Sequence, residues 1–550
     1  MGFISPSLPD FDLDEWARLP HHGKLKPLAQ DWAVNGFGTP SAIYLLYAVK
    51  LVGFVAGAAL VMGLFGDVTW TDPIAYQKAV VWTLLWEILG LGCGSMPLTF
   101  RFVPPIGGLL YFLRPGTIRL PPWPQLPLTA GTTRGPVDVL LYAAVLGDGG
   151  YLLSQDVLRH LPLSILLVCL GLLGLRDKAA FLAARPEHYA VMLIVFLFAP
   201  VNWVFALKLV MVALWWGAAT SKLNRHFPFV VAVMISNTPW QRSTWVKKRL
   251  WRSYPDDLRP SKLAELAAHG GTVVEYLVPL VLLLSHGGLV TAAAVTVMVA
   301  FHVHITSTLP LGVPLEWNLF FIYSTLFLFG HYAAVHTFDA PLLGVILVIT
   351  LVAIPVLGNF RPDLVSFLPG MRYYAGNWAT SAWLFRNDGA EELLDERLTK
   401  AAPIVVKQLE GLYDRQLAEL LLYKGLAFRA MHSHGRALGG LMCRAVDDLS
   451  DYTVREGELV AGVALGWNFG EGHLHHAQLL RAIQERCDFA PGQLRVITLE
   501  AQPMRKDTQA YEILDAATGL LERGQVKVSD MCARQPWLDE DDVTIPVVLA

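Results

Sequence analysis

The chain has 550 residues, of which 54% are hydrophobic and 16% charged, and its mean hydropathy is +0.43. Soluble globular chains are roughly 45–50% apolar and about 25% charged, so this composition excludes an ordinary cytosolic enzyme. The net charge of −3 and the pI near 6.6 give no basic surface of the kind that nucleic-acid binding requires, and we expect no nucleic-acid partner.

The N-terminal segment, residues 1–40, is polar and mixed in charge. It lacks the basic stretch followed by an apolar run that marks a cleavable signal peptide. We therefore predict an N-terminal interfacial segment that lies outside the bilayer, with membrane insertion driven by later parts of the chain.

Apolar runs dominate residues 41–358, and a transmembrane helix needs about 20 mostly apolar residues. Four runs meet this need clearly: 42–64, 79–98, 315–334 and 341–357. Two are shorter, 137–153 and 161–175, and two are longer, 189–220 and 273–304. The longer runs, which polar residues, proline or glycine interrupt, predict hairpins of short, tilted or broken helices. The sequence thus predicts a polytopic domain with about ten crossings.

The orientation follows from lysine and arginine in the loops. Segments 101–134 and 222–252 are basic without an acidic residue, whereas loops 66–77 and 335–340 carry only acids as charged residues. We therefore expect the basic segments inside, and the even number of crossings puts both termini in the cytoplasm. The predicted location is the plasma membrane, as a multi-pass protein.

The tail, residues 359–550, has an ordinary charge density and predicts a soluble domain. Its pattern predicts helices at 395–424 and 474–487, strands at 459–466 and 493–499, and a hairpin or short helix within 511–528. The predicted fold class is therefore an α-helical polytopic membrane domain of about 8–10 spans, followed by a soluble α+β or small α/β domain.

Five cysteines form no CxxC pair, so we expect reduced thiols rather than a disulfide framework or a zinc ribbon. They are Cys93, Cys169, Cys443, Cys487 and Cys532.

Ionisable residues inside apolar runs are costly, and they are functional candidates for that reason. The membrane part has nine of them: Lys50, Glu87, Asp148, Lys208, Lys222, Glu275, His302, His304 and His331. Structural roles compete, since Lys50 and Glu87 are placed to form a packing ion pair and Lys222 to extend toward the membrane surface. Four of the nine, Lys222, Glu275, His302 and His304, follow one another in two clusters, and together they would supply a base, a charge partner and proton relays. We take these four as candidate catalytic residues.

The order of this pattern resembles a known family. An apolar helix ends in Gly217 and Lys222-Leu223, Glu275 precedes Pro279-Leu280, and a further apolar helix closes on His302 and His304. Residues 202–330 thus resemble the HTTM family, the transmembrane domains related to vitamin K-dependent gamma-carboxylase. The resemblance implies that Lys222 deprotonates a hydroquinone. That family holds its reactive groups on the non-cytoplasmic side, however, whereas the charge count puts Lys222 in the cytoplasm.

Nearly the whole chain is similar to an actinobacterial multi-pass membrane family of unknown function. The patterns that carry this resemblance are residues 371–378, MRYYAGNW, and 466–475, GWNFGEGHLH. It implies no established activity.

The second of these patterns also contains candidate ligand-binding residues. Gly470, Gly472 and His473 join a predicted strand to a predicted helix, where free backbone N–H groups bind anions or a cofactor. Imidazole and carboxylate groups are ligands for zinc or iron. The candidate metal ligands are His473, His475, His476 and Glu471. The alternative is a capped turn whose histidines are satisfied by hydrogen bonds.

Aromatic residues gather in the segment 367–385, around Arg372. They predict either an anchor at the headgroups or a roof over a lipid-facing pocket where the two domains meet.

Two functions remain open on the sequence. The first is an integral-membrane enzyme for a lipophilic substrate, such as a quinol, a polyprenyl lipid or an acyl lipid, for which a quinone or lipid is the candidate cofactor. The second is a lipid-handling or scaffold protein of the cell envelope that recruits a protein through its C-terminal domain. Membrane lipids are expected partners in both.

Overall fold

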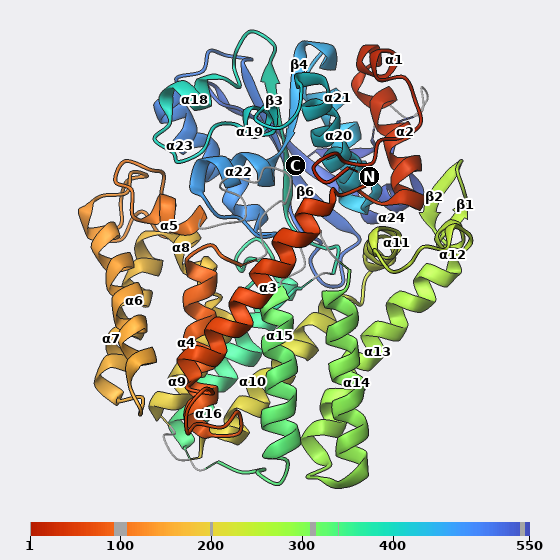
Figure 1. Cartoon of the computed structure of the whole chain (residues 1–550). Helices are drawn as coiled ribbons and strands as arrows, with labels where there is room; N and C mark the ends of the chain where they lie inside the picture. Colours follow the sequence, from red (N-terminus) through yellow and green to blue (C-terminus); the bar gives the residue numbers. More distant parts are fainter. Residues whose placement is uncertain are drawn as a thin grey trace.

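The chain is described by a computed structural model that covers residues 2–92, 107–198, 202–308, 315–338, 340–373, 375–538 and 545–549. Figure 1 shows a bundle of long helices with the tail at one end, and the first helices of the chain lie beside the tail. Some residues named in the sequence analysis lie outside the described residues: Cys93, Tyr374 and 311–314.

Six helices of the described residues are long and apolar enough to cross a membrane. They are α3 (Ser41–Met62), α6 (Pro136–Ser154), α10 (Trp203–Ser221), α13 (Lys262–Leu284), α14 (Gly288–Thr306) and the segment Pro341–Phe360, which comprises α16 (Pro341–Val348), η3 (Ile349–Ala353) and α17 (Ile354–Phe360). Shorter helices run beside them: α4 (Pro73–Ile88), α7 (His160–Arg176), η1 (Pro186–Ala190) with α9 (Val191–Phe198), and α15 (Leu315–Ser324) with η2 (Thr325–His331).

Both long apolar runs form helix pairs. The run 189–220 is divided between α9 and α10, and the run 273–304 between α13 and α14, and the members of each pair pack against each other. A turn with positive φ at His286, Gly287 and Gly288 separates α13 from α14. The interruptions in the sequence therefore mark true breaks between helices.

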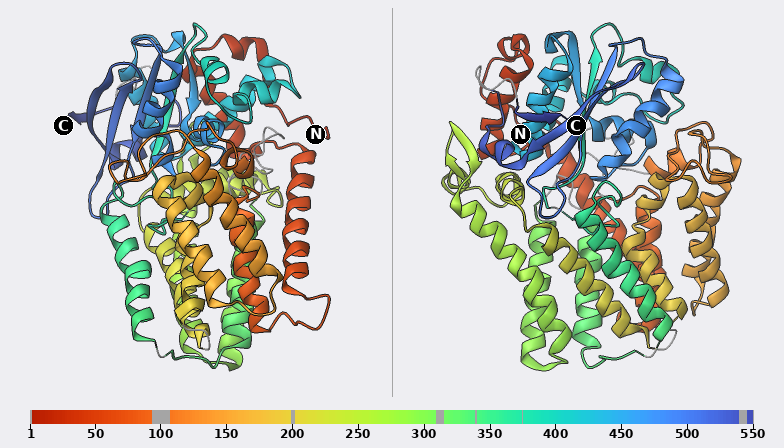
Figure 2. Two further views of the ribbon diagram at one scale, coloured as in Figure 1. Left: turned by 90° about the vertical axis from the view of Figure 1, so that its left-hand side faces the viewer. Right: turned by 180° about the vertical axis from the view of Figure 1, so that it is seen from behind.

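The two ends of the bundle differ in charge. The basic segments that follow α5 (Gly107–Phe112) and α10 lie at the end that carries the tail, whereas the loop between α3 and α4, with Asp67 and Asp72, lies at the far end (Figures 1 and 2). The basic loops, the N-terminal helices and the tail thus share one side, as the charge count predicted. That this side faces the cytoplasm stays a prediction.

Short elements cover the tail end of the bundle. They are α5, α8 (Lys178–Ala183), α11 (Phe227–Asn237), α12 (Thr244–Arg249) and the hairpin of β1 (Trp251–Ser253) and β2 (Asp257–Pro260). No candidate span lies within residues 107–128.

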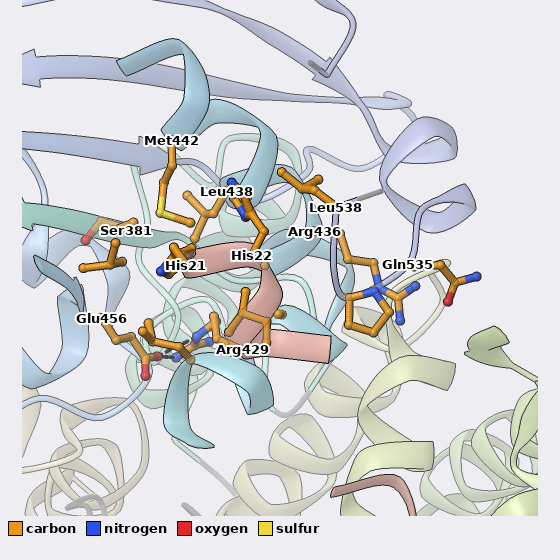
Figure 3. A pocket seen from close by; sticks show the side chains of 18 residues that line it. His21, His22, Ser381, Arg429, Arg436, Leu438, Met442, Glu456, Gln535 and Leu538 are labelled. Atoms are coloured by element: carbon orange, nitrogen blue, oxygen red, sulfur yellow. Dashed lines mark hydrogen bonds and ion pairs between the residues drawn. The ribbon is translucent and has the colours of Figure 1, made fainter. Parts of the chain in front are cut away.

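The segment 1–40 contains α1 (Leu13–Arg18) and α2 (His21–Asn35), and α2 packs against α20 (Arg415–Met431) of the tail. Leu25 and Leu28 of α2 share a small core with Leu420 and Ala427 of α20. Figure 3 shows the cavity beside this contact, whose lining includes His21, His22, Arg429 and Glu456. Its volume of about 30 Å³ is large enough to hold a water molecule.

The tail is built on a six-stranded antiparallel sheet in the order β4-β3-β5-β6-β7-β8. The strands are β3 (Thr380–Arg386), β4 (Tyr452–Glu456), β5 (Leu494–Leu499), β6 (Thr508–Asp515), β7 (Gly519–Lys527) and β8 (Val547–Leu549). Its helices are α18 (Leu393–Arg397), α19 (Val405–Glu410), α20, α21 (Ser433–Ala445), η4 (Leu449–Asp451), α22 (Gly457–Leu465), η5 (Gly472–His475), α23 (Ala477–Cys487) and α24 (Val528–Ala533). An antiparallel sheet of this kind is typical of an α+β domain.

Helices cover both faces of the sheet, and one face continues into the bundle. Ala382 and Leu384 of β3 pack with Leu441 of α21, whereas Trp383 and Phe385 point to the other face. That second face belongs to the same hydrophobic cluster as the buried residues of α4, α10 and α15. The membrane part and the tail are therefore joined by one continuous core.

Two of the predicted tail elements differ from the structure. Residues 459–466, predicted as a strand, lie mainly in helix α22, since an eight-residue apolar run has no period that separates the two structures. The helix predicted at 395–424 is broken into α18, α19 and the start of α20, with Pro403 and Gly411 between them. The helix at 474–487, the strand at 493–499 and the hairpin alternative at 511–528 are confirmed.

Candidate functional site

Lys222 and Glu275 form a buried ion pair. Lys222 caps the C-terminal end of α10, and Glu275 lies in α13, which packs along α10. The Lys222 Nζ atom is 2.6 Å from Glu275 Oε1 and 2.5 Å from Oε2. Because both carboxylate oxygens are bonded to the ammonium group, the pair is closed, and neither group is left as a free base.

The two histidines of the predicted cluster lie on different faces of α14. His302 is buried: Trp215 Nε1 donates to its Nε2 at 2.9 Å, and its Nδ1 lies 2.8 Å from Asn318 Oδ1. The indole bond requires Nε2 to accept, so the proton sits on Nδ1 and is donated to Asn318. His304, two residues on, is exposed and faces Trp240. Lys222 and Glu275 are thus brought together, and His304 is not part of their site.

Other charged residues of the membrane part have structural contacts. Lys50 donates to Gly92 O at 3.1 Å; among the described residues its charge acts on Glu87, but the two form no ion pair, and Arg185 is the ion-pair partner of Glu87. Lys208 donates to three carbonyl groups after η2, those of Tyr332, Ala333 and Val335, at 2.7–3.0 Å.

The glycines of residues 470–473 serve chain packing. A Cβ atom at Gly472 would lie 2.0 Å from Ala379 O, and Gly470 has a φ of +59°. The loop thus follows a helix rather than the predicted strand, and its backbone lies directly against a neighbouring segment. Gly470, Gly472 and His473 therefore do not form the open anion-binding loop that the sequence predicted.

A three-residue cluster suited to a metal ion does lie in the tail, but its residues differ in part from the four predicted ligands. His473, His476 and Glu500 each offer a ligand atom, and these atoms lie within 4.8 Å of one another. His475 instead faces Ser381 Oγ at 2.7 Å, and Glu471 accepts from Leu368 N at 2.6 Å. Two of the four predicted ligands thus remain, and Glu500, at the end of β5, joins them.

The electrostatics of this cluster favour an ionised carboxylate. Burial raises the pKa of Glu500, but the His473 and His476 rings and the hydrogen bond from Ala501 N outweigh it and hold the pKa at about 2. Burial lowers the pKa of His476 to about 4. The cluster therefore offers a charged oxygen ligand and a neutral imidazole at neutral pH.

A second set of charged residues, which the sequence did not single out as a group, lies buried where the bundle meets the tail. The carboxylates of Glu87 (α4), Glu187 (η1) and Glu316 (α15) interact electrostatically, with Arg185 among them. Arg185 Nε is 3.7 Å from Glu87 Oε2, and Tyr373 OH donates to Glu187 Oε1 at 3.0 Å. We call Glu87, Arg185, Glu187, His188, Tyr189 and Glu316 the junction cluster.

Glu87, Glu187, His188 and Tyr189 of the junction cluster each have one buried polar atom without a hydrogen-bond partner among the described residues. Two are acceptors, Glu87 Oε1 and Glu187 Oε2, and the others are His188 Nε2 and the Tyr189 hydroxyl. Trp317 Nε1 donates to His188 Nδ1 at 2.6 Å, so the His188 proton sits on Nε2 and makes that atom a donor. Buried polar groups are normally hydrogen-bonded, so these donors and acceptors indicate a bound water or polar ligand group.

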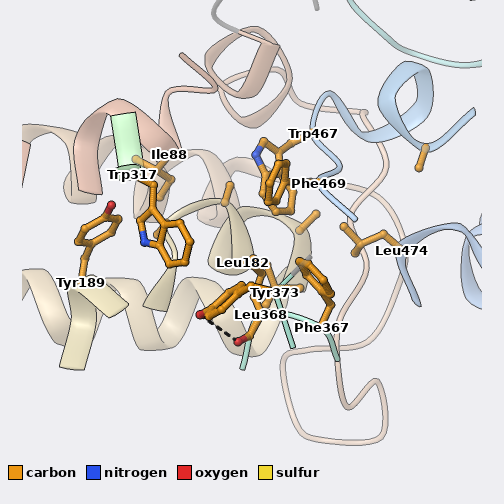
Figure 4. Packing of buried hydrophobic residues seen from close by; sticks show 14 of the residues in the cluster. Ile88, Leu182, Tyr189, Trp317, Phe367, Leu368, Tyr373, Trp467, Phe469 and Leu474 are labelled. Atoms are coloured by element: carbon orange, nitrogen blue, oxygen red, sulfur yellow. Dashed lines mark hydrogen bonds between the residues drawn. The ribbon is translucent and has the colours of Figure 1, made fainter. Parts of the chain in front are cut away.

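Aromatic side chains enclose the junction cluster. Figure 4 shows Tyr189 and Trp317 from the bundle near Phe367, Tyr373 and Phe469 from the tail loops. His188 stacks on Tyr189 with ring centroids 4.3 Å apart, and the Arg185 guanidinium lies 4.1 Å from the Phe469 ring centroid.

The aromatic segment 367–385 thus lies inside the junction. Tyr373 and Trp383 are buried, which does not agree with an anchor among headgroups, and a lipid-facing pocket under this segment stays a prediction.

A basic groove lies at the surface of the same end of the bundle. Its volume is about 540 Å³, and its lining combines cations with aromatic rings on α12, the β1–β2 hairpin and the start of α13. These are Lys248, Arg249, Arg252 and Lys262, with Trp245, Trp251 and Tyr254. Trp245 is 63% exposed. We call these seven residues the basic groove.

Comparison with known proteins gives one match. A family model described as "Transmembrane protein of unknown function (DUF3556)" matches residues 1–548. No curated protein and no solved structure matches the chain.

Proposed function

Since the chain belongs to the DUF3556 family of transmembrane proteins, we propose that it is an integral-membrane enzyme that acts on a lipophilic substrate by acid–base chemistry at the junction cluster. The observation that carries the proposal is the set of four buried, unpaired polar atoms on Glu87, Glu187, His188 and Tyr189. A carboxylate that takes up a proton and an imidazole N–H that gives one are the two parts of a general acid–base pair.

The substrate class follows from the walls of the site. Aromatic rings and membrane helices surround the polar atoms, and water is therefore excluded from most of their surface. A molecule with a hydrocarbon body and one polar reacting group, such as a quinol, a polyprenyl lipid or an acyl lipid, matches these surroundings.

Lys222 and Glu275 have a structural role in this proposal. They hold α10 against α13 through a closed ion pair, and His302 is fixed by Trp215 and Asn318. The matching family has a different description from the HTTM family, so the hydroquinone chemistry of that family is not transferred to Lys222.

Membrane lipids are the proposed partners of the basic groove. Four cations without an acidic lining residue complement the phosphates of anionic lipids, and exposed Trp245 is suited to the headgroup layer.

The test is a turnover experiment on the full chain in lipid nanodiscs. The protein is incubated with a total lipid and quinone extract of its native membrane, and the extract is compared by mass spectrometry before and after. We expect one substrate–product pair with the wild-type protein and a loss of about 100-fold or more with Glu187→Gln, the range of acid–base contributions. Glu265→Gln, which alters an exposed carboxylate of α13, is the matched control.

Two results would oppose the enzyme proposal. One is an extract that the wild-type protein leaves unchanged. The other is a product that Glu87→Gln and Glu187→Gln form at the wild-type rate. A protein that copurifies in equal amount through residues 359–550, with no change in the extract, would support the scaffold function instead.

A further inference from the structure

His473, His476 and Glu500 come from three neighbouring elements of the tail. His473 lies in η5, His476 caps the N-terminus of α23, and Glu500 follows the last residue of β5. Their ligand atoms lie within 4.8 Å of one another, and His473 Nε2 is 2.8 Å from Glu500 Oε2. Ligands of a tetrahedral zinc ion, with bonds of about 2.0–2.2 Å, lie about 3.3–3.6 Å apart, so the contact between His473 and Glu500 has to lengthen by about half an ångström when an ion binds.

The remaining atoms of these side chains are held in the way that metal sites hold their ligands. His476 Nε2 lies 3.1 Å from Thr380 O, where it donates its proton, and this leaves the Nδ1 lone pair free to bind. Glu500 Oε1 accepts a hydrogen bond from Ala501 N at 2.8 Å, and Glu500 Oε2 faces His473. Lys178 Nζ donates a hydrogen bond to the His473 carbonyl oxygen at 3.4 Å.

A second, independent observation lies beside the cluster. Glu471 is fully buried, and its charge interacts with Arg372 and Lys178 as well as with His473, while its Oε2 atom lacks a hydrogen-bond partner among the described residues. A buried, unpaired carboxylate oxygen is costly unless a cation or a bound water lies near it.

We propose that His473, His476 and Glu500 bind a zinc-class divalent ion, with its fourth position open to a water molecule. Two imidazoles and one carboxylate form the ligand set of catalytic zinc sites, and structural sites use four protein ligands instead. The side chains of His473 and Glu500 are 18% and 19% exposed, which gives the open position access to solvent. This site is separate from the junction cluster and stands without the proposed function.

The competing arrangement is a plain ion pair between a protonated His473 and Glu500. It needs no metal, and the two arrangements differ in metal content.

The experiment uses the full chain in nanodiscs. The protein is stripped with a chelator, equilibrated with ZnCl₂ and desalted, and its zinc content is measured by elemental mass spectrometry. We expect one zinc ion per chain and a rise in the unfolding temperature on zinc addition. Cobalt(II), added to the stripped protein in place of zinc, is expected to give the visible absorption of a four-coordinate ion.

Three variants and two controls locate the ion. His473→Ala, His476→Ala and Glu500→Gln are each expected to weaken zinc binding by more than about 100-fold, the upper end of the cost of losing an outer-shell partner. His269→Ala and Glu485→Gln, which alter exposed residues, are expected to bind as the wild type does. A wild-type protein that holds no zinc after equilibration with ZnCl₂ and desalting would overturn the proposal, whatever the variants do. So would a Glu500→Gln protein that retains as much zinc as the wild type.

Discussion

Trp317 donates its indole N–H to Nδ1 of His188 at 2.6 Å and so fixes the His188 proton on Nε2, inside the junction cluster. Trp317 lies in α15 and His188 in η1, so the bond joins two separate helices of the bundle. The tautomer of a histidine decides whether a given ring nitrogen gives or takes a proton. Trp317 is therefore a positioning residue for the proposed chemistry.

We predict that Trp317→Phe lowers turnover of the lipophilic substrate because His188 loses the bond that sets its tautomer. The unpaired Nδ1 atom also costs about 1–3 kcal/mol of unfolding free energy. Denaturant unfolding and the extract assay measure the two effects. Trp240→Phe removes the exposed indole bond to Ser307 and is the control. Equal loss of activity in both variants would show that Trp317 has no special role.

For the Lys222–Glu275 pair, we predict that each single alanine substitution destabilises the protein by about 3–5 kcal/mol because it leaves a buried charge unpaired. The double variant Lys222→Met with Glu275→Leu is expected to regain most of this stability and to keep its activity. Unfolding curves and the extract assay decide between the roles. A double variant that is stable and inactive would restore the catalytic role that the sequence predicted.

Stability of the tail is expected to fall in mild acid. Burial, with the nearby Arg429 guanidinium, lowers the pKa of His432 to about 3 and that of His434 well below its ordinary value. Above pH 6.5 both histidines are neutral in the folded and the unfolded chain, so they do not change the unfolding free energy. Below pH 6.5 the histidines of the unfolded chain bind protons and those of the folded chain do not. The unfolding free energy therefore falls by about 1.4 kcal/mol per pH unit for each histidine.

The unfolding temperature at pH 7.5 and at pH 5.5 measures this effect, and His432→Asn is expected to reduce the difference. His269→Asn, at an exposed position, is expected to leave it unchanged. An unfolding temperature that rises toward pH 5.5 would contradict the sign.

Gly472→Ala tests whether the glycine serves packing. The new Cβ atom would lie 2.0 Å from Ala379 O, a backbone atom that cannot move aside easily. We therefore expect the unfolding free energy to fall by about 2 kcal/mol or more. Gly425→Ala in α20 meets nothing within 4 Å and is expected to add up to about 1 kcal/mol of helix stability. Thermal unfolding of both variants checks this. A stable Gly472→Ala protein would mean that the loop is open after all.

Lipid binding at the basic groove is predicted to depend on charge. The variant Lys248→Glu with Arg249→Glu is expected to retain fewer phosphatidylglycerol molecules than the wild type, counted by native mass spectrometry after nanodisc release. The double variant Arg523→Glu with Lys527→Glu, at exposed positions of strand β7, carries the same change in net charge and is the control. Equal lipid counts in all three proteins would remove lipids as ligands of the groove.

The fold was predictable wherever the signal is local. The run 42–64 predicted α3, observed at Ser41–Met62, since a long apolar stretch has one stable form in lipid. The strand at residues 493–499 followed from alternation, and the helix at 474–487 from its period. The strand predicted at residues 459–466 was wrong because eight apolar residues fit a strand or a buried helix equally well.

The sites were less predictable because they are assembled from distant segments. Lys222 and Glu275 were found as charges within apolar runs. Glu187 and Glu316 lie at the ends of such runs, where a charge normally faces water, yet both are buried in the structure, and Tyr373 from the tail donates to Glu187. Glu500 replaced Glu471 as a candidate ligand because the register of β5, and not a sequence spacing, brings it to His473.

The most direct test of the junction cluster is a cryo-EM map of the full chain in native-lipid nanodiscs, at a resolution that shows ordered water. We predict density that is not protein within hydrogen-bond distance of Glu187 Oε2 and His188 Nε2, as an ordered water or the polar end of a lipid. A map in which these two atoms bond directly to protein groups, with no density between them, would contradict it.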